Sequence, residues 1–186
     1  SICFAQQGEN DYHAIFDNGL CAIVHPSAAA VALVALDAKV EIARRTGEGA
    51  RRKTERREIP IAELFVPPER DLHREHVLEA NEILTEIRIP APRPGARSAY
   101  AKLGEKESFD WPIAEVAVAL ELDGPIVRSA RIVLGAAAPV PRRAEKAEKL
   151  LVGKALDETT ARAAAKAAVL GATPLSNNGH RVTILE

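Results

Sequence analysis

IAEVAVALELDGPIVRSARIVL, residues 113–134, contains two apolar runs joined by a short turn. Ile113–Leu122 and Ile126–Leu134 are expected to form two β-strands. Asp123-Gly124 lies between them, and this dipeptide strongly favours a tight hairpin turn. The stretch therefore predicts an antiparallel β-hairpin against which the neighbouring elements pack.

More strands are expected before this hairpin, and helices are expected after it. Ile83–Ile89 and Ser98–Leu103 have the patterns of strands, and Pro90 ends the first of them. Helices are predicted at Pro141–Val152 and Asp157–Leu170, with Asp157 as the N-cap of the second. Strands followed by helices predict an α+β fold, with the helices on one face of an antiparallel sheet.

The first third of the chain has a different pattern. Residues 1–18 are polar and turn-rich, whereas Pro26–Leu36 is rich in alanine and leucine and predicts a buried helix that begins at a proline. Lys39–Ala43 alternates as a strand does, Arg44–Glu58 predicts a charged hairpin or loop, and Ile61–Phe65 predicts a short helix or turn.

A domain boundary is expected near Pro67–Glu79, which contains two adjacent prolines. It divides the chain into residues 1–70 and residues 71–186. A length of 186 residues is consistent with one or two domains.

Composition argues against several classes of function. A net charge of −1 gives no field that would attract nucleic acid, and the arginine-rich run at positions 44–57 is interleaved with glutamates, so it predicts a solvated hairpin. The longest strongly apolar stretch, Ala28–Leu36, is too short to cross a bilayer. Two cysteines do not make a disulfide scaffold. We therefore expect a soluble cytoplasmic protein with neither nucleic-acid binding nor membrane insertion.

Three short blocks resemble a known family. They are Cys21-Ala-Ile-Val-His-Pro-Ser27, the run EILTEIRIP at residues 82–90, and Lys102 followed by Ser108-Phe109-Asp110. In that order they resemble the FAD-binding subunit of the molybdenum hydroxylases, the family of xanthine, aldehyde and carbon monoxide dehydrogenases. The resemblance implies part of an FAD-binding domain, followed by a C-terminal domain of three or four antiparallel strands with a helical bundle.

The resemblance implies an oxidoreductase subunit whose chemistry belongs to its cofactors. Substrate would be oxidised at a molybdopterin centre on a large partner subunit. Electrons would pass through [2Fe–2S] clusters on a small partner subunit to FAD on this chain, and then to an external acceptor.

Two features support an alternative, a non-catalytic docking module that binds partner subunits and holds no flavin. The chain has no glycine-rich loop for the FAD pyrophosphate, and Ala28 stands where the family usually has an aspartate that contacts the flavin side of FAD. The sequence also contains no methionine. We therefore expect a fragment that lacks the family's N-terminal FAD subdomain.

The resemblance implies three cofactor-binding residues, Leu84, Lys102 and Asp110. Leu84 would lie against the isoalloxazine ring, and Lys102 would lie near the pyrimidine edge, where its ammonium would stabilise the anion formed when flavin is reduced. Asp110 ends the same motif, and the alternative for it is a structural partner of a neighbouring backbone group or lysine. Periodicity alone describes Leu84 as an ordinary strand residue and Lys102 as an ordinary surface lysine.

Cys3 and Cys21 allow three interpretations. They are two small buried hydrophobic residues, or they form a zinc site with His13 and His25, although these residues lack the two tight pairs that structural zinc sites normally show. The resemblance implies the third, in which both are thiolate ligands of a [4Fe–4S] cluster shared with two cysteines upstream of Ser1. Since half of that ligand set would be absent, we expect residues 1–18 to be poorly anchored.

Overall fold

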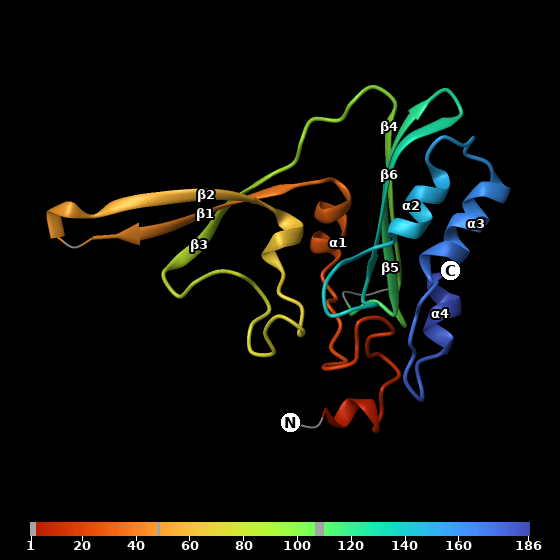
Figure 1. Ribbon diagram of the computed structural model, residues 1–186, viewed down its shortest axis with the longest axis horizontal. Coiled ribbons are helices and arrows are strands. Elements are labelled where there is room, and N and C mark those ends of the chain that lie inside the picture. The colour runs from red at the N-terminus through yellow and green to blue at the C-terminus, as the bar shows by residue number, and fades with distance from the viewer. Residues whose placement is uncertain (1–2, 48, 107–109) are drawn as a thin grey trace.

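The computed structural model describes residues 3–47, 49–106 and 110–186, and in it the strands form two separate antiparallel sheets (Figure 1). The first sheet has the order β2-β1-β3 and consists of β1 (Lys39–Thr46), β2 (Lys53–Pro60) and β3 (Glu82–Arg88). The second has the order β4-β5-β6-β7 and consists of β4 (Ala96–Leu103), β5 (Ala114–Asp123), β6 (Ile126–Gly135) and β7 (Arg142–Arg143). The predicted α+β class is confirmed.

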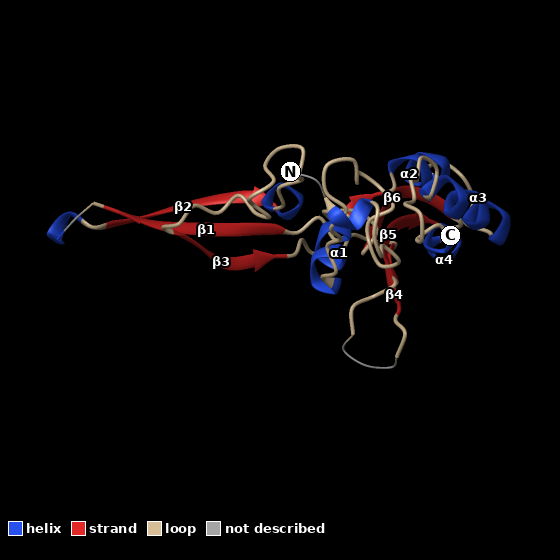
Figure 2. Ribbon diagram, turned by 90° about the horizontal axis from the view of Figure 1, so that it is seen from below, coloured by secondary structure: helices blue, strands red, loops and turns tan. Residues whose placement is uncertain are grey.

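Helices cover both faces of the four-stranded sheet. The helices α2 (Glu145–Leu151), α3 (Glu158–Ala168) and α4 (His180–Leu185) lie on one side, and α1 (Ala28–Ala35) lies on the other, next to the three-stranded sheet (Figures 1 and 2). Three short 3₁₀ segments complete the elements, at Phe4–Gln6, Gly49–Arg51 and Ile61–Leu64. No helix in the described parts of the chain has the length and apolar character needed to cross a membrane.

The predicted hairpin of β5 and β6 is confirmed and forms the centre of the larger sheet. Gly124 in its turn has a φ of 57°, a left-handed conformation that glycine adopts without strain. Val116 and Val118 of β5 pack with the α2 and α3 side of the core, while Ala117 and Ala119 pack with α1. Successive side chains of a strand point to opposite faces, so this hairpin is covered on both faces rather than on one as predicted.

The structure corrects the placement of β3. We expected Ile83–Ile89 to join the C-terminal sheet, but β3 pairs with β1, with Arg88 opposite Lys39 and Leu84 opposite Ile42. Alternation in a sequence indicates a strand, but it does not specify the partner strand. The boundary between residues 1–70 and 71–186 stays a prediction.

The first predicted C-terminal helix begins later than expected. Arg142–Arg143 forms the short strand β7 and pairs with Val133 and Leu134 of β6, so α2 begins at Glu145. The second predicted helix is confirmed as α3, and the Asp157 carboxylate accepts a hydrogen bond from the amide of Thr160 at 2.7 Å. The short helix α4 was not predicted.

The expectation of a poorly anchored N-terminus is wrong for the described residues. Residues 14–16 are almost completely buried. The Ile15 amide donates to the Ala137 carbonyl at 2.9 Å, and the Thr173 amide donates to the Ile15 carbonyl at 2.7 Å. The side-chain amide of Asn18 also donates to the Thr173 carbonyl, at 2.8 Å. The segment therefore lies inside the core, between the end of β6 and the C-terminal part of the chain.

A buried arginine on α4 holds these segments together. Arg181 is 0% exposed, and its guanidinium donates to the carbonyls of His13, Ile113 and Ala136, the Nε bond to Ile113 being 3.2 Å long. Burial away from water lowers the pKa of Arg181. The five donors of one guanidinium can satisfy several carbonyls at once, which a lysine ammonium cannot match in geometry.

Replacing this arginine should destabilise the whole fold. We expect Arg181→Met to lower the free energy of unfolding by about 3 kcal/mol or more, because buried carbonyls left without a donor cost about 1–3 kcal/mol each. Urea denaturation of the purified chain measures this loss. Arg162→Met is the matched control, since Arg162 is exposed and forms an ion pair with Glu158 on the same helix, α3, and its loss should be about 0.5 kcal/mol or less. Equal losses in the two variants would contradict the role given to Arg181.

Candidate functional site

Lys102 lies near the end of the edge strand β4, where the strand is exposed. Its ammonium donates to the backbone carbonyl of Asp110 at 2.6 Å, so the two ends of the loop after β4 are brought together. In the described part of the chain, Lys102 forms no salt bridge. Two residues of the same motif, Ser108 and Phe109, lie outside the described residues. The structure thus joins Lys102 to Asp110 through the backbone of the aspartate.

Leu84 occupies the other sheet. It is half-buried on β3 opposite Ile42 and packs against the core cluster that contains Val40 and Ile42. The helix α1 lies between β3 and β4 in both views (Figures 1 and 2). Leu84 and Lys102 are therefore separate parts of the candidate site, and Leu84 also has the structural role that periodicity predicts.

The beginning of α1 shows how the His-Pro-Ser segment is used. Ser27 is the N-cap, and its hydroxyl accepts a hydrogen bond from the amide of Ala30 at 3.2 Å. The His25 ring lies edge-on to Phe65 with centroids 4.8 Å apart, and partial burial lowers the pKa of His25. His25 therefore packs against a neighbouring ring instead of capping the helix.

Cys3 lies close to the backbone of Ala22, the residue after Cys21. The backbone amide of Ala22 is the largest of the influences that lower the pKa of Cys3. The side chain of Gln6 donates to the carbonyl of Asn18 at 2.8 Å and ties the two segments together. Both cysteines are free thiols and half-buried, so neither is a core residue.

The zinc interpretation receives no support. Over residues 3–47, 49–106 and 110–186, no three His, Cys, Asp or Glu side chains are placed to hold one metal ion. His13 and His25 therefore do not complete a site with the two cysteines. A metal site at this end of the chain would therefore receive two thiolate ligands from the described residues, Cys3 and Cys21.

Sequence reasoning missed Glu115, which lies opposite Lys102 in the pairing of β4 and β5. Glu115 is 2% exposed, and the Tyr100 hydroxyl donates to its Oε2 at 2.7 Å. Burial raises the pKa of Glu115, against the opposing effects of the Tyr100 hydrogen bond and the Lys102 charge. The sequence did contain a signal for this residue, because Glu115 is a charged residue within the apolar run IAEVAVAL.

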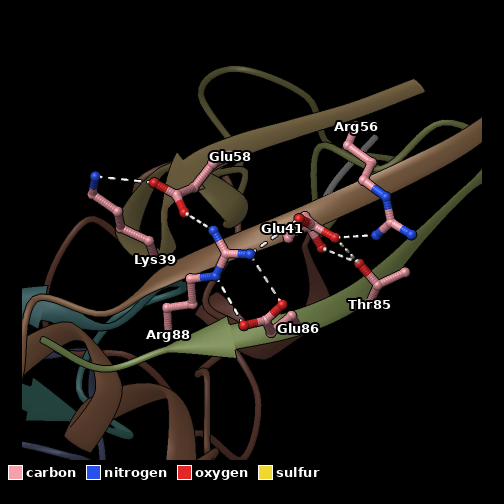
Figure 3. A network of polar contacts seen from close by, with 7 residues as sticks. All are labelled: Lys39, Glu41, Arg56, Glu58, Thr85, Glu86 and Arg88. Carbon is pink, nitrogen blue, oxygen red and sulfur yellow. Dashed lines mark hydrogen bonds and ion pairs between the residues drawn. The ribbon is translucent and has the colours of Figure 1, made fainter. Parts of the chain in front are cut away.

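The predicted solvated hairpin is confirmed by a network of ion pairs on the exposed face of the three-stranded sheet (Figure 3). Arg88 is at its centre, donating to Glu58 at 2.9 Å and to Glu86 at 2.8 Å. The remaining members are Lys39, Glu41, Arg56 and Thr85. The network pairs arginines with the interleaved glutamates, so this face carries little unbalanced charge. Glu48, also in the charged run, lies outside the described residues.

Comparison with known proteins supports the family resemblance of the sequence. Residues 98–182, which include Lys102 and Asp110, match the family described as the CO dehydrogenase flavoprotein C-terminal domain. Residues 98–182 therefore resemble this flavoprotein domain, and the chain is similar to flavoprotein subunits of aldehyde oxidoreductase and carbon monoxide dehydrogenase. A carbon monoxide dehydrogenase structure from Hydrogenophaga pseudoflava has a TM-score of 0.67 and 32% identity to this chain, covering 84% of this chain and 50% of that one.

Two curated relatives of this flavoprotein family show how much of the subunit is present. The chain is 34% identical over 152 residues to the aldehyde oxidoreductase FAD-binding subunit PaoB of Escherichia coli, covering 81% of this chain and 44% of PaoB. It is 40% identical over 93 residues to the carbon monoxide dehydrogenase medium chain of Hydrogenophaga pseudoflava, covering 50% of this chain and 32% of that one. The chain thus spans less than half the length of these relatives.

The residues present fit one part of an FAD site. The exposed ammonium of Lys102 is available to an anionic group, and the half-buried Leu84 offers an apolar surface. Ser27 is already engaged as a helix cap, and Ala28 has no side-chain acceptor. The described residues thus offer a cation and an apolar side chain of the kinds that the ring end of FAD would contact, and the sequence contains no glycine-rich cradle for its pyrophosphate.

One ion pair beside Leu84 should make the fold sensitive to acid. Arg57 contacts both carboxylate oxygens of Glu82, at 3.1 and 2.9 Å, and these bonds contribute most to lowering the pKa of Glu82 to about 2. The pair therefore stabilises the folded chain at pH values above 4.5, the ordinary pKa of a glutamate, and this stabilisation is lost as the pH falls towards 2.

We expect Glu82→Gln to flatten the dependence of stability on pH within this window. Thermal denaturation at a series of pH values between about 2 and 5 measures it. Glu63→Gln, which changes an exposed carboxylate on the segment Ile61–Leu64, is the control. A profile that Glu82→Gln leaves as steep as before would contradict the prediction.

Proposed function

We propose that this chain is the flavin-bearing, electron-transferring part of a multi-subunit molybdenum hydroxylase, an oxidoreductase. The observation that carries the proposal is the match of residues 98–182, with Lys102 at the end of its first strand, to a flavoprotein domain. The names of the relatives, an FAD-binding subunit and carbon monoxide dehydrogenase medium chains, support FAD as the cofactor.

Bound FAD would supply the chemistry of accepting and passing on electrons. The chain's own residues would position the ring and adjust its energy. The ammonium of Lys102, held by the Asp110 carbonyl, would face the ring edge that becomes negative on reduction, and a nearby cation stabilises such charge. Leu84 would supply apolar contact to the ring. Asp110 would contribute the backbone carbonyl that orients Lys102.

The partner subunits we propose are a molybdopterin-binding large subunit and a small subunit that carries [2Fe–2S] clusters. Electrons would move from the molybdenum centre through those clusters to FAD on this chain and then to an external acceptor. Large exposed apolar side chains at the end of the larger sheet are consistent with contacts to further protein, since Leu103 is 50% exposed and Trp111 is 72% exposed. We propose that the assembled enzyme acts in the cytoplasm.

The first test is the reduction potential of the flavin in the purified holoenzyme. We expect Lys102→Met to lower the potential by on the order of 30 mV, the two-electron equivalent of about 1.4 kcal/mol. Lys166→Met, which removes an exposed lysine from the last turn of α3, is the matched control and should leave the potential unchanged. Thermal stability should change by less than about 0.5 kcal/mol in both variants.

Two results would decide against this proposal. An unchanged potential with a large loss of stability would make Lys102 a structural lysine. A purified complex that is colourless, without the absorption bands of flavin, would support the docking module that holds no cofactor.

We also propose that Cys3 and Cys21 are two ligands of a [4Fe–4S] cluster, with the other two ligands supplied by residues upstream of Ser1. The proximity of Cys3 to the backbone at Ala22 supports this, because two ligands of one cluster must converge. The amide donors around Cys3 favour its thiolate form, which is the form that binds iron.

Iron and acid-labile sulfide analysis of the full-length subunit tests the cluster. We expect about four iron atoms per subunit, and we expect Cys21→Ser to abolish them. A protein in which flavin is retained but Cys21→Ser leaves the iron content unchanged would show that these cysteines bind no cluster.

A further inference from the structure

Glu115 is a buried carboxyl that neither the fold nor the proposed electron transfer accounts for. It lies near the beginning of β5, opposite Lys102 of β4 on one side and Gly135 of β6 on the other. Side chains of directly paired residues on adjacent strands point to the same face of a sheet. Glu115 therefore lies beside the candidate flavin lysine, on the same face of the sheet.

The carboxyl is only partly satisfied. Its Oε2 accepts the hydroxyl hydrogen of Tyr100, but Oε1 is fully buried and has no hydrogen-bond partner among the described residues. An unpaired buried polar atom destabilises a fold, and a buried carboxylate does so more strongly. A leucine at this position would avoid both losses, and a glutamine would avoid the burial of a charge.

The surroundings leave room for this group. A Cβ atom on Gly135 would lie 2.2 Å from Glu115 Oε1 and 2.4 Å from Cγ2 of Val31. Any side chain larger than hydrogen at position 135 would therefore collide with the carboxyl and with α1. Gly135 thus leaves the space that the carboxyl of Glu115 occupies, and Tyr100 donates a hydrogen bond to it.

Few charged groups face Glu115. The helix α1, with the sequence AAAVALVA, contains no titratable residue, and β6 contributes Gly135. Arg181 of α4 donates to the carbonyls of Ile113 and Ala136, which flank the site. From β4 come Tyr100, as a hydrogen-bond donor, and Lys102, as the charge that favours the carboxylate. Among the described residues, Lys102 is the cation whose charge lowers the pKa of this carboxyl.

We propose that Glu115 is a positioning residue for Lys102, a buried carboxyl that sets how strongly the ammonium acts on the bound flavin. This inference rests on the proposed function. An ionised Glu115 attracts the ammonium and offsets its charge, which weakens its effect on the ring, and a neutral Glu115 leaves the full charge of Lys102 to the flavin. Burial raises the pKa of Glu115 and the charge of Lys102 lowers it. As the pH rises through this pKa, Glu115 loses its proton and its negative charge offsets the ammonium, so the flavin should become harder to reduce.

The first arm of the test needs no flavin. A folded pKa above the ordinary value of 4.5 means that the folded chain holds the proton longer than the unfolded chain, so stability falls as the pH rises from 4.5 through the folded pKa. At low pH we expect Glu115→Gln and the wild type to have the same melting temperature. At a pH above the folded pKa of Glu115, we expect the variant to have the higher melting temperature. Glu121→Gln, on the same strand with an exposed ion pair to Arg93, is the matched control and should show no such gain. If Glu115→Gln gives no gain at any pH, the buried carboxyl is not costly and the proposal is overturned.

The second arm measures the flavin reduction potential of the holoenzyme across the same pH series. Glu115→Gln should leave the potential unchanged at low pH and raise it above wild type by a difference that grows with pH. In the Lys102→Met background the same change should have a much smaller effect, because the ammonium through which Glu115 acts on the flavin is absent. The control Glu121→Gln should follow the wild type at every pH.

The two arms separate the possible failures. If Lys102→Met does not alter the potential, the proposed role of Lys102 fails. If Lys102→Met lowers the potential while Glu115→Gln shifts it at no pH, or shifts it equally without Lys102, the inference about Glu115 fails and the flavin function stands.

Discussion

The buried guanidinium of Arg181 is the constraint on which the rest of this structure depends. It is a fully buried cation whose partners are backbone carbonyls at His13, Ile113 and Ala136, and these belong to the N-terminal segment, the approach to β5 and the exit from β6. Satisfying buried carbonyls requires donors in a fixed geometry, and the planar fork of arginine provides them. One side chain near the end of the chain therefore holds its beginning against the central hairpin.

The helix α1 occupies the junction between the two sheets, with no charged side chain and mostly alanine and valine. Small side chains allow the two sheets to approach the helix closely from both sides, and its residues share a core cluster with β1 and β5. The candidate flavin residues are arranged around this helix. Leu84 lies on one sheet and Lys102 on the other, so the distance between them depends on the packing of α1.

Charge is used in two ways in this chain. On the three-stranded sheet, Arg88 and its neighbours form exposed pairs (Figure 3), each of which contributes about 0–1 kcal/mol at most. They keep a projecting, arginine-rich hairpin well solvated. Glu115 is the opposite case, a single carboxyl taken almost completely out of water beside Lys102. Groups that a fold retains at a loss of stability tend to lie at functional sites, and these two residues lie where the flavoprotein family match begins.

Local sequence determined most of the elements of this protein, but not β7 or α4. The hairpin of β5 and β6 with its Asp-Gly turn, the charged hairpin of β1 and β2, the helix after Ser27 and the Asp157 cap all follow from periodicity and turn or capping chemistry, which act over a few residues. Three family blocks likewise indicated Lys102 and Asp110 before their contact was known. Only the tertiary structure decided that β3 pairs with β1, that residues 14–16 enter the core and that Glu115 is buried beside Lys102. These outcomes depend on contacts between residues far apart in the chain, and the free energy of such contacts is set by the packing of the whole fold rather than by any local pattern.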